Sequence, residues 1–447
     1  MIERSCLMSR TYLKNVRIVD GTGAPAIENG LYVFDNIEDK FNEDVVEYVG
    51  EMNEEILSQA GPEDAVFDLT GHTILPGLIN CHVHLDLMLP YRGLGNDYDE
   101  FGVPYRTMLC YRRAAEALDC GVTTIRSAAL PDDIDIGLKK AINKNMVCGP
   151  NVIACGKGLV AHNGHGSEEN SVVMCSGVDE FMKAARLQLA AGADQLKMMY
   201  TGGMASANEG LCDMQMTDDE VKAVVDVAHR AGKKCFAHLS NDKAIRQSVL
   251  LGVDSVEHGY TLSKETAELM AEHGTYYVPT ISVSNSDDYL IAHGCPKHQV
   301  EKGREAARTH RQGVTFAKEA GVKICVGTDL LPSDPVDGTN ATVREVELLV
   351  ECGLTPMEAI KAATANGAEL CGLQDVTGNL KPGLMGDFIV VEGKPDENIH
   401  DLRNLRLVAK HCRLIWSTLS NLNVRRFSIL APGYKMEGGT FCDWRLN

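Results

Sequence analysis

The stretch Ile74-Leu-Pro-Gly-Leu-Ile-Asn-Cys-His-Val-His-Leu-Asp86 decides which fold the sequence predicts. It sets a Pro-Gly turn signal in an apolar run, a pattern typical of a buried strand. His82 and His84 lie near its end, and side chains two residues apart on a strand project to the same side. The two imidazoles could therefore bind one metal ion; the alternative is a pair of structural histidines. Cys81 falls on the opposite face, so we do not expect it to be a ligand.

From Thr73 to about residue 373, short apolar segments alternate with amphipathic helical ones. Residues 178–191 and 218–231 carry apolar side chains at helical spacing, and each is followed by a glycine, as expected after a helix end. Eight strand–helix units over roughly 250–300 residues favour a (β/α)8 barrel. A doubly wound open sheet is the alternative, but no Gly-x-Gly-x-x-Gly follows the first strand. The strands are expected at 74–83, 121–127, 151–159, 195–200, 234–239, 254–259, 275–282 and 323–329.

Both ends of the chain have a different character, with short strand patterns separated by Gly and Asp turns. These patterns lie within residues 11–70 and again between Gly386 and Trp416. We therefore expect an α/β protein in which a (β/α)8 TIM-like barrel carries a small β-sandwich domain built from both termini. Nothing in the pattern predicts a role for residues 421–447. The expected boundaries are 1–72 for the first part of the sandwich, 73–376 for the barrel, and 377–447 for the rest of the sandwich and a tail.

The composition is ordinary for a folded protein, since 44% of the 447 residues are hydrophobic and 23% are charged. The formal net charge of −19 argues against a nucleic-acid partner, whose phosphates require a basic surface. The first ten residues lack the apolar core of a signal peptide, and no apolar run reaches the length of about 18 residues typical of a membrane span. The 15 cysteines are scattered, which is typical of reduced thiols in a cytoplasm. We expect a cytoplasmic homo-oligomer that acts on a small molecule, with neither nucleic acid nor a membrane as partner.

Four further polar side chains lie in or at the end of predicted strands. Lys197 lies in the fourth strand, His238 ends the fifth, His258 the sixth and Asp329 the eighth. In a barrel these positions meet at the C-terminal mouth, where catalytic groups lie. Each residue alone has a structural interpretation, such as a hydrogen-bonded histidine or a lysine that reaches toward solvent. Together with the histidine pair they would leave many buried polar groups unpaired without a metal, and their nitrogen and oxygen atoms fit Zn²⁺, Mn²⁺ or a similar divalent ion.

Several motifs resemble those of the amidohydrolase superfamily, over nearly the whole chain. Residues 75–84, Leu-Pro-Gly-Leu-Ile-Asn-Cys-His-Val-His, are similar to its first-strand signature, and residues 121–124, Gly-Val-Thr-Thr, to its second. The most similar subgroup is the imidazolonepropionase-related metal-dependent hydrolases, which include dipeptidases acting before a C-terminal proline or arginine and ochratoxin-type amidases. The marks of this subgroup recur as Asn163-Gly-His-Gly, Thr201-Gly-Gly, Ala228-His-Arg-Ala-Gly, Ser255-Val-Glu-His-Gly, Val278-Pro-Thr, Gly327-Thr-Asp and Ala362-Ala-Thr-Ala-Asn-Gly-Ala.

The resemblance implies a site for two divalent metal ions. Zinc is the expected metal, and manganese or cobalt are the alternatives. A bridging lysine, converted by CO2 to a carbamate, is part of the implied site, because carboxylation turns a buried ammonium into an anionic ligand. The implied assignment is His82, His84 and Asp329 on the first metal, His238 and His258 on the second, and carboxylated Lys197 between them.

The reaction implied is hydrolysis of the amide bond of a dipeptide or N-acyl amino acid by a metal-activated hydroxide. Asp329 would act as general base and then deliver the proton to the leaving nitrogen. His165, in the loop after the third strand, would stabilise the carbonyl oxygen or oxyanion. The weaker candidates for substrate contacts are Tyr200, Thr201, His162 and Arg92.

Some positions depart from the family pattern. Ser127 stands where Asp is common, and His162 and Asn163 replace smaller residues near the expected substrate, so the substrate is not given by the sequence. One alternative is a cyclic-amide hydrolase, of the imidazolonepropionase type, or a deaminase. Deaminases use a glutamate three residues after the fifth-strand histidine, where this chain has Asn241. A non-catalytic relative is a further alternative, but such proteins have lost ligands, and this chain keeps all six.

Overall fold

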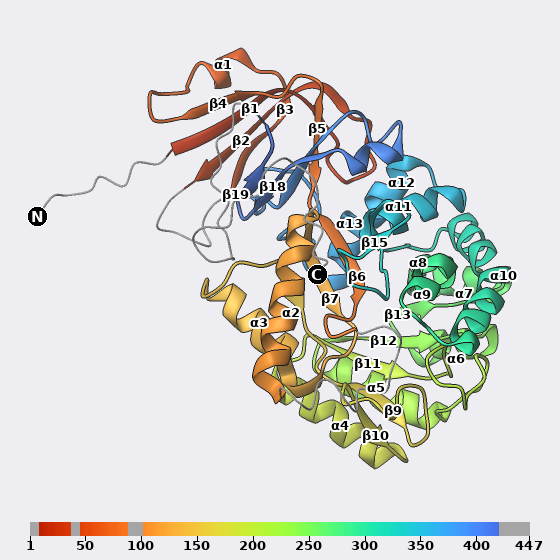
Figure 1. Cartoon of the computed structure of the whole chain (residues 1–447). Helices are drawn as coiled ribbons and strands as arrows, with labels where there is room; N and C mark the ends of the chain where they lie inside the picture. The colour runs from red at the N-terminus through yellow and green to blue at the C-terminus, as the bar shows by residue number, and fades with distance from the viewer. Residues whose placement is uncertain (1–8, 37–44, 88–101, 420–447) are drawn as a thin grey trace, which may run out of the picture.

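The computed structural model describes residues 9–36, 45–87 and 102–419. Strands from the two ends of the chain form one eight-stranded sheet, in the order β19-β18-β17-β5-β1-β2-β3 with β4 paired to β1. Figure 1 shows this sheet at the top of the molecule and the α/β part beneath it. The strands are β1 (Ser9–Ile18), β2 (Ile27–Asn36), β3 (Val46–Glu51), β4 (Ala65–Asp68), β5 (His72–Pro76), β17 (Phe388–Glu392), β18 (Leu405–Lys410) and β19 (Arg413–Ser417).

The two ends of the chain are joined by pairing between β5 and β17. The strands run antiparallel, with Ile74 opposite Val390. Beside them, Tyr32 of β2 meets Phe388 of β17 edge-to-face, with ring centroids 5.1 Å apart. These side chains belong to one buried apolar cluster, so burial of apolar surface holds the N-terminal and C-terminal strands together.

Gly77 divides the first predicted strand in two. Residues up to Pro76 belong to β5 in the terminal sheet, and β6 (Leu78–Val83) begins the α/β part. A Cβ atom at position 77 would lie 2.2 Å from Oγ1 of Thr123 on the neighbouring β7. Only glycine allows this approach, so the Pro-Gly pair marks the point at which the chain passes from one sheet to the next.

The α/β part contains two parallel sheets and a two-stranded ribbon of β15 (Pro335–Val336) and β16 (Thr339–Asn340). The three-stranded sheet has the order β6-β7-β8, and the six-stranded sheet has the order β10-β9-β11-β12-β13-β14. Every pair within these two sheets is parallel, as in strand–helix–strand units. Their strands are β7 (Val122–Ser127), β8 (Asn151–Ile153), β9 (Gly158–Ala161), β10 (Val172–Cys175), β11 (Gln195–Met199), β12 (Lys234–Leu239), β13 (Ser255–His258) and β14 (Tyr276–Val278).

Individual backbone hydrogen bonds connect the two parallel sheets at both sides. Asp194 N donates to Ala154 O at 2.7 Å, next to the start of β11. On the other side, Cys325 N donates to Tyr277 O of β14 at 2.8 Å, and Cys81 N of β6 donates to Val326 O at 2.7 Å. The segment 323–329 therefore lies between β14 and β6 without being a regular strand.

The sequence-based strand predictions were wrong in four places, of which the first is the division of the first strand at Gly77. The expected eighth strand has only an isolated bridge, between Tyr277 and Ile324. The expected third strand is two strands, β8 and β9. The expected seventh ends at Val278, because Pro279 has no N–H to donate and Thr280 has a left-handed backbone, with φ of 53°. The predicted barrel strands consequently lie in the two parallel sheets, except for residues 74–76, which belong to the terminal sheet, and segment 323–329. No single closed sheet is formed by the described residues.

Helices lie between the strands along the chain (Figure 1). The predicted helix 178–191 is confirmed as α4, and the predicted helix 218–231 ends one residue early as α5. Gly192, which follows the last residue of α4, has φ of 118°, a backbone conformation that residues other than glycine rarely adopt. The helices are α1 (Glu54–Leu57), α2 (Gly102–Asp119), α3 (Ile134–Asn143), α4 (Val178–Ala191), α5 (Asp218–Arg230), α6 (Asp242–Leu251), α7 (Lys264–His273), α8 (Ile281–Ser284), α9 (Asp287–Ala292), α10 (Lys297–Ala320), α11 (Ala341–Glu351), α12 (Pro356–Ala362) and α13 (Ala365–Cys371), with 3-10 turns η1 (Pro131–Asp133) and η2 (Ile399–Arg403).

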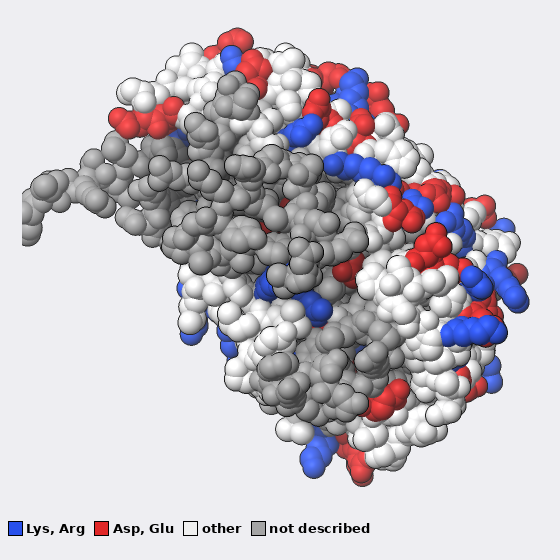
Figure 2. All heavy atoms as spheres, viewed as in Figure 1, with Lys and Arg blue, Asp and Glu red and all other residues white. Residues whose placement is uncertain are grey.

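The surface carries mixed charge. Figure 2 shows acidic and basic side chains interspersed on the face it presents, rather than gathered into one large basic area. Within the described ranges, no helix has the length and apolar character needed to cross a membrane. The tail 421–447 lies outside the described residues.

Candidate metal centre and active site

All six predicted metal ligands line one cavity in the α/β part. They come from the ends of β6, β11, β12 and β13 and from the segment that follows β14 and α10. Parallel strands bring their C-terminal ends to the same edge, which is why residues far apart in the sequence meet here. The six are His82, His84, Lys197, His238, His258 and Asp329.

His82, His84 and Asp329 form the tightest group. Oδ1 of Asp329 lies 3.3 Å from Nε2 of His82 and 3.1 Å from Nε2 of His84. The ligand atoms of the three residues all lie within 4.8 Å of one another. Nε2 of His82 is buried without a hydrogen-bond partner, which is costly for a polar atom unless something else binds it. A divalent cation fits this group, because imidazole nitrogen and carboxylate oxygen are common zinc ligands.

The other nitrogen of His82 is fixed by a buried carboxylate. Nδ1 lies 2.6 Å from Oε2 of Glu257, whose Oε1 accepts hydrogen bonds from Arg126 Nη2 at 2.7 Å and Ser255 Oγ at 2.6 Å. Burial opposes the charge of Glu257, but the Arg126 guanidinium and then His82 outweigh it and lower its pKa to about 2. Glu257 is therefore an anion that accepts the Nδ1 proton, and the lone pair of Nε2 is directed into the cavity.

His238 and His258 form a second pair of imidazoles, with ring centroids 4.4 Å apart. Nε2 of His238 lies 3.1 Å from Gly202 O, and Nδ1 of His258 lies 2.7 Å from Thr280 Oγ1. Each ring thus has one nitrogen tied to the protein and one left toward the cavity. Burial lowers the pKa of both rings well below the usual range, which keeps them neutral and able to act as ligands.

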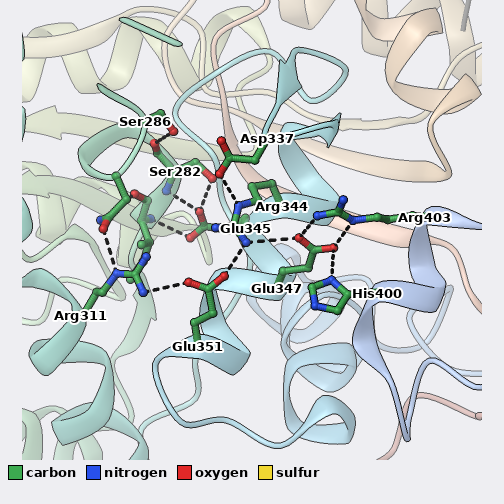
Figure 3. Close-up of polar contacts among 12 residues, drawn as sticks. Ser282, Ser286, Arg311, Asp337, Arg344, Glu345, Glu347, Glu351, His400 and Arg403 are labelled. Carbon is green, nitrogen blue, oxygen red and sulfur yellow. Dashed lines mark hydrogen bonds and ion pairs between the residues drawn. The ribbon is translucent and has the colours of Figure 1, made fainter. Parts of the chain in front are cut away.

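A buried glutamate of α11 binds the two residues that follow Thr280, the hydrogen-bond partner of His258. Glu345 accepts hydrogen bonds from Ile281 N at 2.8 Å, Ser282 N at 2.7 Å and Ser282 Oγ at 2.6 Å, at the start of α8 (Figure 3). These contacts set the chain directly after Thr280. In the same view, Glu347 of α11 pairs with Arg403 of η2, at 2.6 and 2.7 Å. Polar contacts thus connect α11 both to the segment after Thr280 and to η2.

Lys197 of β11 is 1% exposed. Among the described residues, no hydrogen bond from its Nζ is found, and Nζ lies 5.2 Å from the centroid of the Phe236 ring. Burial lowers the pKa of Lys197 to about 8, although Glu257 and Asp329 act in the opposite direction. Burial therefore makes the neutral amine of Lys197 more abundant near neutral pH than it is for an exposed lysine.

Asp329 is the acidic member of the group. Burial opposes its charge, but His258, His82 and His84 outweigh burial and hold its pKa well below the usual range. Its backbone has φ of 56°, and its N–H donates to His82 O at 2.9 Å. A non-glycine residue in this conformation carries strain, so the surrounding structure holds the carboxylate against the two β6 histidines.

His165 also lines the cavity, as the sequence predicted. It lies in the turn between β9 and β10, and its ring stacks on His238 with centroids 4.4 Å apart and an interplanar angle of 26°. Nδ1 of His165 lies 2.6 Å from Oε1 of Glu209. Burial acts to lower the pKa of His165, but the bond to Glu209 outweighs it and the pKa is raised.

Three of the four suggested substrate contacts lie away from the cavity wall, and Arg92 lies outside the described residues. Tyr200 donates its hydroxyl to Asp218 Oδ1 at 3.0 Å, which directs it toward α5. Thr201 Oγ1 accepts from Ser240 N at 2.9 Å, and His162 is exposed beside Ser176, with Nδ1 2.8 Å from its Oγ. These hydrogen bonds give the three side chains partners within the protein, and their contact with substrate stays a prediction.

Sequence reasoning missed Arg126 and Glu257, both fully buried. A signal was present: Arg126 interrupts an otherwise apolar and small-residue strand, and Glu257 lies two residues from Ser255, on the same side of β13. Other residues of the cavity wall that were not predicted are Asp86, Glu169 and Tyr260.

The model of the amidohydrolase family matches residues 73–414. The chain belongs to the amidohydrolase family. It is 32% identical to an ochratoxinase of Aspergillus niger over 354 residues, 73% of this chain and 71% of the relative. The crystal structure of A. niger ochratoxinase, 28% identical, covers 92% of this chain and 96% of that one with a TM-score of 0.78.

The chain is also similar to a dipeptidase and to an imidazolonepropionase. A crystal structure of a Xaa-Pro dipeptidase with bound methionine in the active site is 29% identical, with a TM-score of 0.79, and the match covers 92% of this chain and all of that one. An imidazolonepropionase of Deinococcus deserti is 25% identical over 362 residues, 74% of this chain and 81% of the relative. This family and these relatives identify the chain as a hydrolase that acts on carbon–nitrogen bonds, and divalent-metal binding is typical of the family.

Proposed function

We propose that the protein is a binuclear metal-dependent amidohydrolase that cleaves an amide bond of a small molecule, most simply a dipeptide or an N-acyl amino acid. The main support is that four imidazoles, a carboxylate and a lysine line one cavity. In His82, His238 and His258, one ring nitrogen is hydrogen-bonded to the protein and the other is left for a ligand. The Xaa-Pro dipeptidase and ochratoxinase similarities support this substrate class.

The proposal assigns each side chain to a metal. Lys197, whose lowered pKa favours the neutral amine, would react with CO2 to give a carbamate that bridges the two sites. The carbamate would also explain a lysine buried without a hydrogen bond among the described residues. Zinc is the first candidate, with manganese or cobalt as alternatives. The first metal would be held by His82, His84 and Asp329, and the second by His238 and His258.

We also propose that the two parallel sheets close into one (β/α)8 barrel, in which segment 323–329 takes the position of the eighth strand. We propose further that the terminal sheet forms a small sandwich. The hydrogen bonds on both sides of segment 323–329 support the closure. We further propose domain boundaries at 72–73 and 376–377. We propose a homo-oligomer in the cytoplasm, with neither nucleic acid nor a membrane as partner.

Divalent ions held by these residues would supply a water of lowered pKa and would polarise the scissile carbonyl. Asp329, an anion next to both β6 histidines, takes the proton from the attacking water and delivers it to the leaving nitrogen. Glu209 accepts a hydrogen bond from Nδ1–H of His165 and raises the pKa of the ring, which favours a second proton on Nε2. This Nε2–H donates to the carbonyl oxygen as negative charge develops there. The walls of the cavity position the substrate between these groups.

A cyclic-amide hydrolase is the second candidate, because an imidazolonepropionase is among the relatives. The deaminase alternative is less well supported: Asn241 caps α6, with its side chain accepting a hydrogen bond from Ala244 N at 2.9 Å, so this position has a structural role.

The test is a mass-spectrometric screen of the zinc-loaded protein against dipeptides, N-acyl amino acids and small lactams. Cleavage of linear amides supports the main proposal, and cleavage of lactams alone supports the second candidate. Failure to cleave any amide, by a protein that holds its metal, would contradict both.

A further inference from the structure

A closed ring of hydrogen bonds holds both the backbone and the side chain of His165. His165 N donates to Gln215 Oε1 at 2.8 Å, Gln215 Nε2 donates to Glu209 Oε2 at 2.9 Å, and Glu209 Oε1 lies 2.6 Å from His165 Nδ1. Glu209 therefore uses both carboxylate oxygens, one on the imidazole and one on the amide that holds the backbone of the same histidine. Such a ring fixes the position of His165 and the orientation of its side chain together.

The loop that carries Glu209 is clamped from outside by Lys302 of α10. Its Nζ donates to three backbone carbonyls, at 3.0 Å to Gly203 O, 2.5 Å to Ser206 O and 2.7 Å to Glu209 O. An ammonium has three donors, and all three are used on this one loop. The residues of the loop between these points include Met204, which lines the cavity, so the clamp fixes part of the cavity wall.

Close packing leaves the imidazole one arrangement. A Cβ atom at Gly203 would lie 2.2 Å from His165 Cε1, and the ring stacks on His238. With the loop against its edge, His238 against its face and Nδ1 bound to Glu209, the nitrogen that remains for a ligand in the cavity is Nε2.

We propose that Glu209, secured by Gln215 and Lys302, is a positioning residue: its carboxylate accepts a hydrogen bond from Nδ1–H of His165, which keeps the proton on Nδ1 and directs Nε2 at the substrate carbonyl. The catalytic consequence rests on the proposed amide hydrolysis, whereas the arrangement of the ring does not. Metal binding is not expected to depend on Glu209, because none of the proposed ligands contacts it.

The first test detects the hydrogen bond between His165 and Glu209 directly. Protein labelled with ¹⁵N-histidine and loaded with zinc is studied by long-range ¹H–¹⁵N correlation, and the His165 signals are assigned as those lost in His165→Gln. We expect a hydrogen-bonded Nδ1 proton at His165 that disappears in Glu209→Ala and weakens in the milder Glu209→Gln and in Lys302→Met. The matched controls Glu305→Ala and Lys297→Met, at exposed positions on α10, should leave it unchanged. An Nδ1 signal that survives in folded Glu209→Ala would overturn the proposal.

The second test is a double-mutant cycle with the best amide found in the screen. Loss of a positioned donor typically costs about 10²- to 10³-fold in kcat, so we expect His165→Gln to fall by that amount and Glu209→Ala by about 10- to 100-fold, with zinc content unchanged. The double variant should be no slower than His165→Gln. If the fold-losses in kcat of the two single variants multiply in the double variant, the two residues act independently and the proposal is overturned. Because the first test does not require turnover, a protein that cleaves no amide would contradict the proposed function and leave the assignment of Glu209 to be decided by the spectra.

Discussion

Nδ1 of His82 lies 2.6 Å from Oε2 of Glu257, in the interior between β6 and β13. The same carboxylate is bound by the guanidinium of Arg126, which is stacked over the Phe236 ring with 4.1 Å between Cζ and the centroid. This buried chain of arginine, glutamate and histidine orients the first proposed metal ligand. Hydrogen bonds of this kind fix the tautomer and direction of a ligating imidazole.

Replacement of Glu257 should therefore weaken both the fold and the metal site. In Glu257→Gln the Arg126 charge loses its partner in the interior, and we expect the free energy of unfolding to fall by about 3–5 kcal/mol. Metal affinity should fall about 10- to 100-fold, because the anionic acceptor of the His82 Nδ1 proton becomes a neutral amide with one acceptor oxygen. Denaturant unfolding and a zinc titration measure the two effects, with Glu392→Gln, at an exposed ion pair to Arg406, as control. Unchanged metal affinity would show that the carboxylate does not orient the ligand.

Lys197→Ala should lose most of the bound metal and with it the activity. The change removes the proposed bridge and leaves a space beside two metal sites. Short carboxylates such as acetate or propionate should restore part of both, since they supply an anionic oxygen ligand. Lys222→Ala, at a lysine of α5 paired with Asp226 on the surface, is the matched control and should keep its metal. Full metal content and activity in Lys197→Ala, measured by elemental analysis and turnover, would exclude a bridging role.

Gly203→Ala tests the packing of the loop against His165. The added methyl group would occupy the space of the imidazole ring, at 2.2 Å from Cε1, so the ring must move from its place on His238. We expect kcat/KM to fall by about 10²-fold or more, the size expected for loss of one positioned donor, while zinc content stays the same. Gly137→Ala is the control, because nothing lies within 4 Å of its added Cβ. Equal activity of the two variants would mean that the ring position is unimportant.

His310 should make stability depend on pH between about 6.5 and 4. Its Nε2–H donates to His258 O at 2.8 Å, and Ser284 Oγ lies 2.7 Å from Nδ1. Burial lowers the pKa of His310 to about 4 from the ordinary 6.5. Because the unfolded chain takes up the proton first, the contribution of neutral His310 is fully present above pH 6.5 and is lost as the pH falls toward 4.

The comparison of wild type with His310→Gln isolates this contribution. Both are unfolded by denaturant at a series of pH values, and the difference between their free energies of unfolding should shrink as the pH falls from about 6.5 to about 4. His273→Gln, at an exposed residue of α7, should follow the wild type throughout. A difference that stays constant over this range would contradict the assignment of a neutral buried imidazole.

The sequence predicted the candidate site better than it predicted the strands. Six potential ligands were identified because each ends or interrupts an apolar segment, and parallel strands bring such positions together. The segment 323–329 was expected as a strand from its apolar residues. In the structure it has one isolated bridge, and its last residue, Asp329, takes a positive φ. A backbone of this kind depends on tertiary contacts, here with His82 O, that a local pattern does not contain.

The parts of the site that were missed depend on pairing across the fold. Arg126 and Glu257 are 131 positions apart in the sequence, and nothing local to either shows that they meet. Glu209 likewise reaches His165 from 44 positions away, through a loop without regular structure. Tyr200 and Thr201 are not among the residues that line the cavity, because hydrogen bonds to Asp218 and Ser240 set the directions of their side chains.

The metal content of the purified protein, measured by elemental analysis together with amide hydrolysis on the same sample, tests the central claim most directly. The account predicts about two divalent ions per chain, as in other two-metal hydrolytic sites, with activity that chelation removes and zinc restores. One tightly bound ion with full activity would contradict the binuclear assignment, and amide hydrolysis by protein without any divalent metal would contradict the account as a whole.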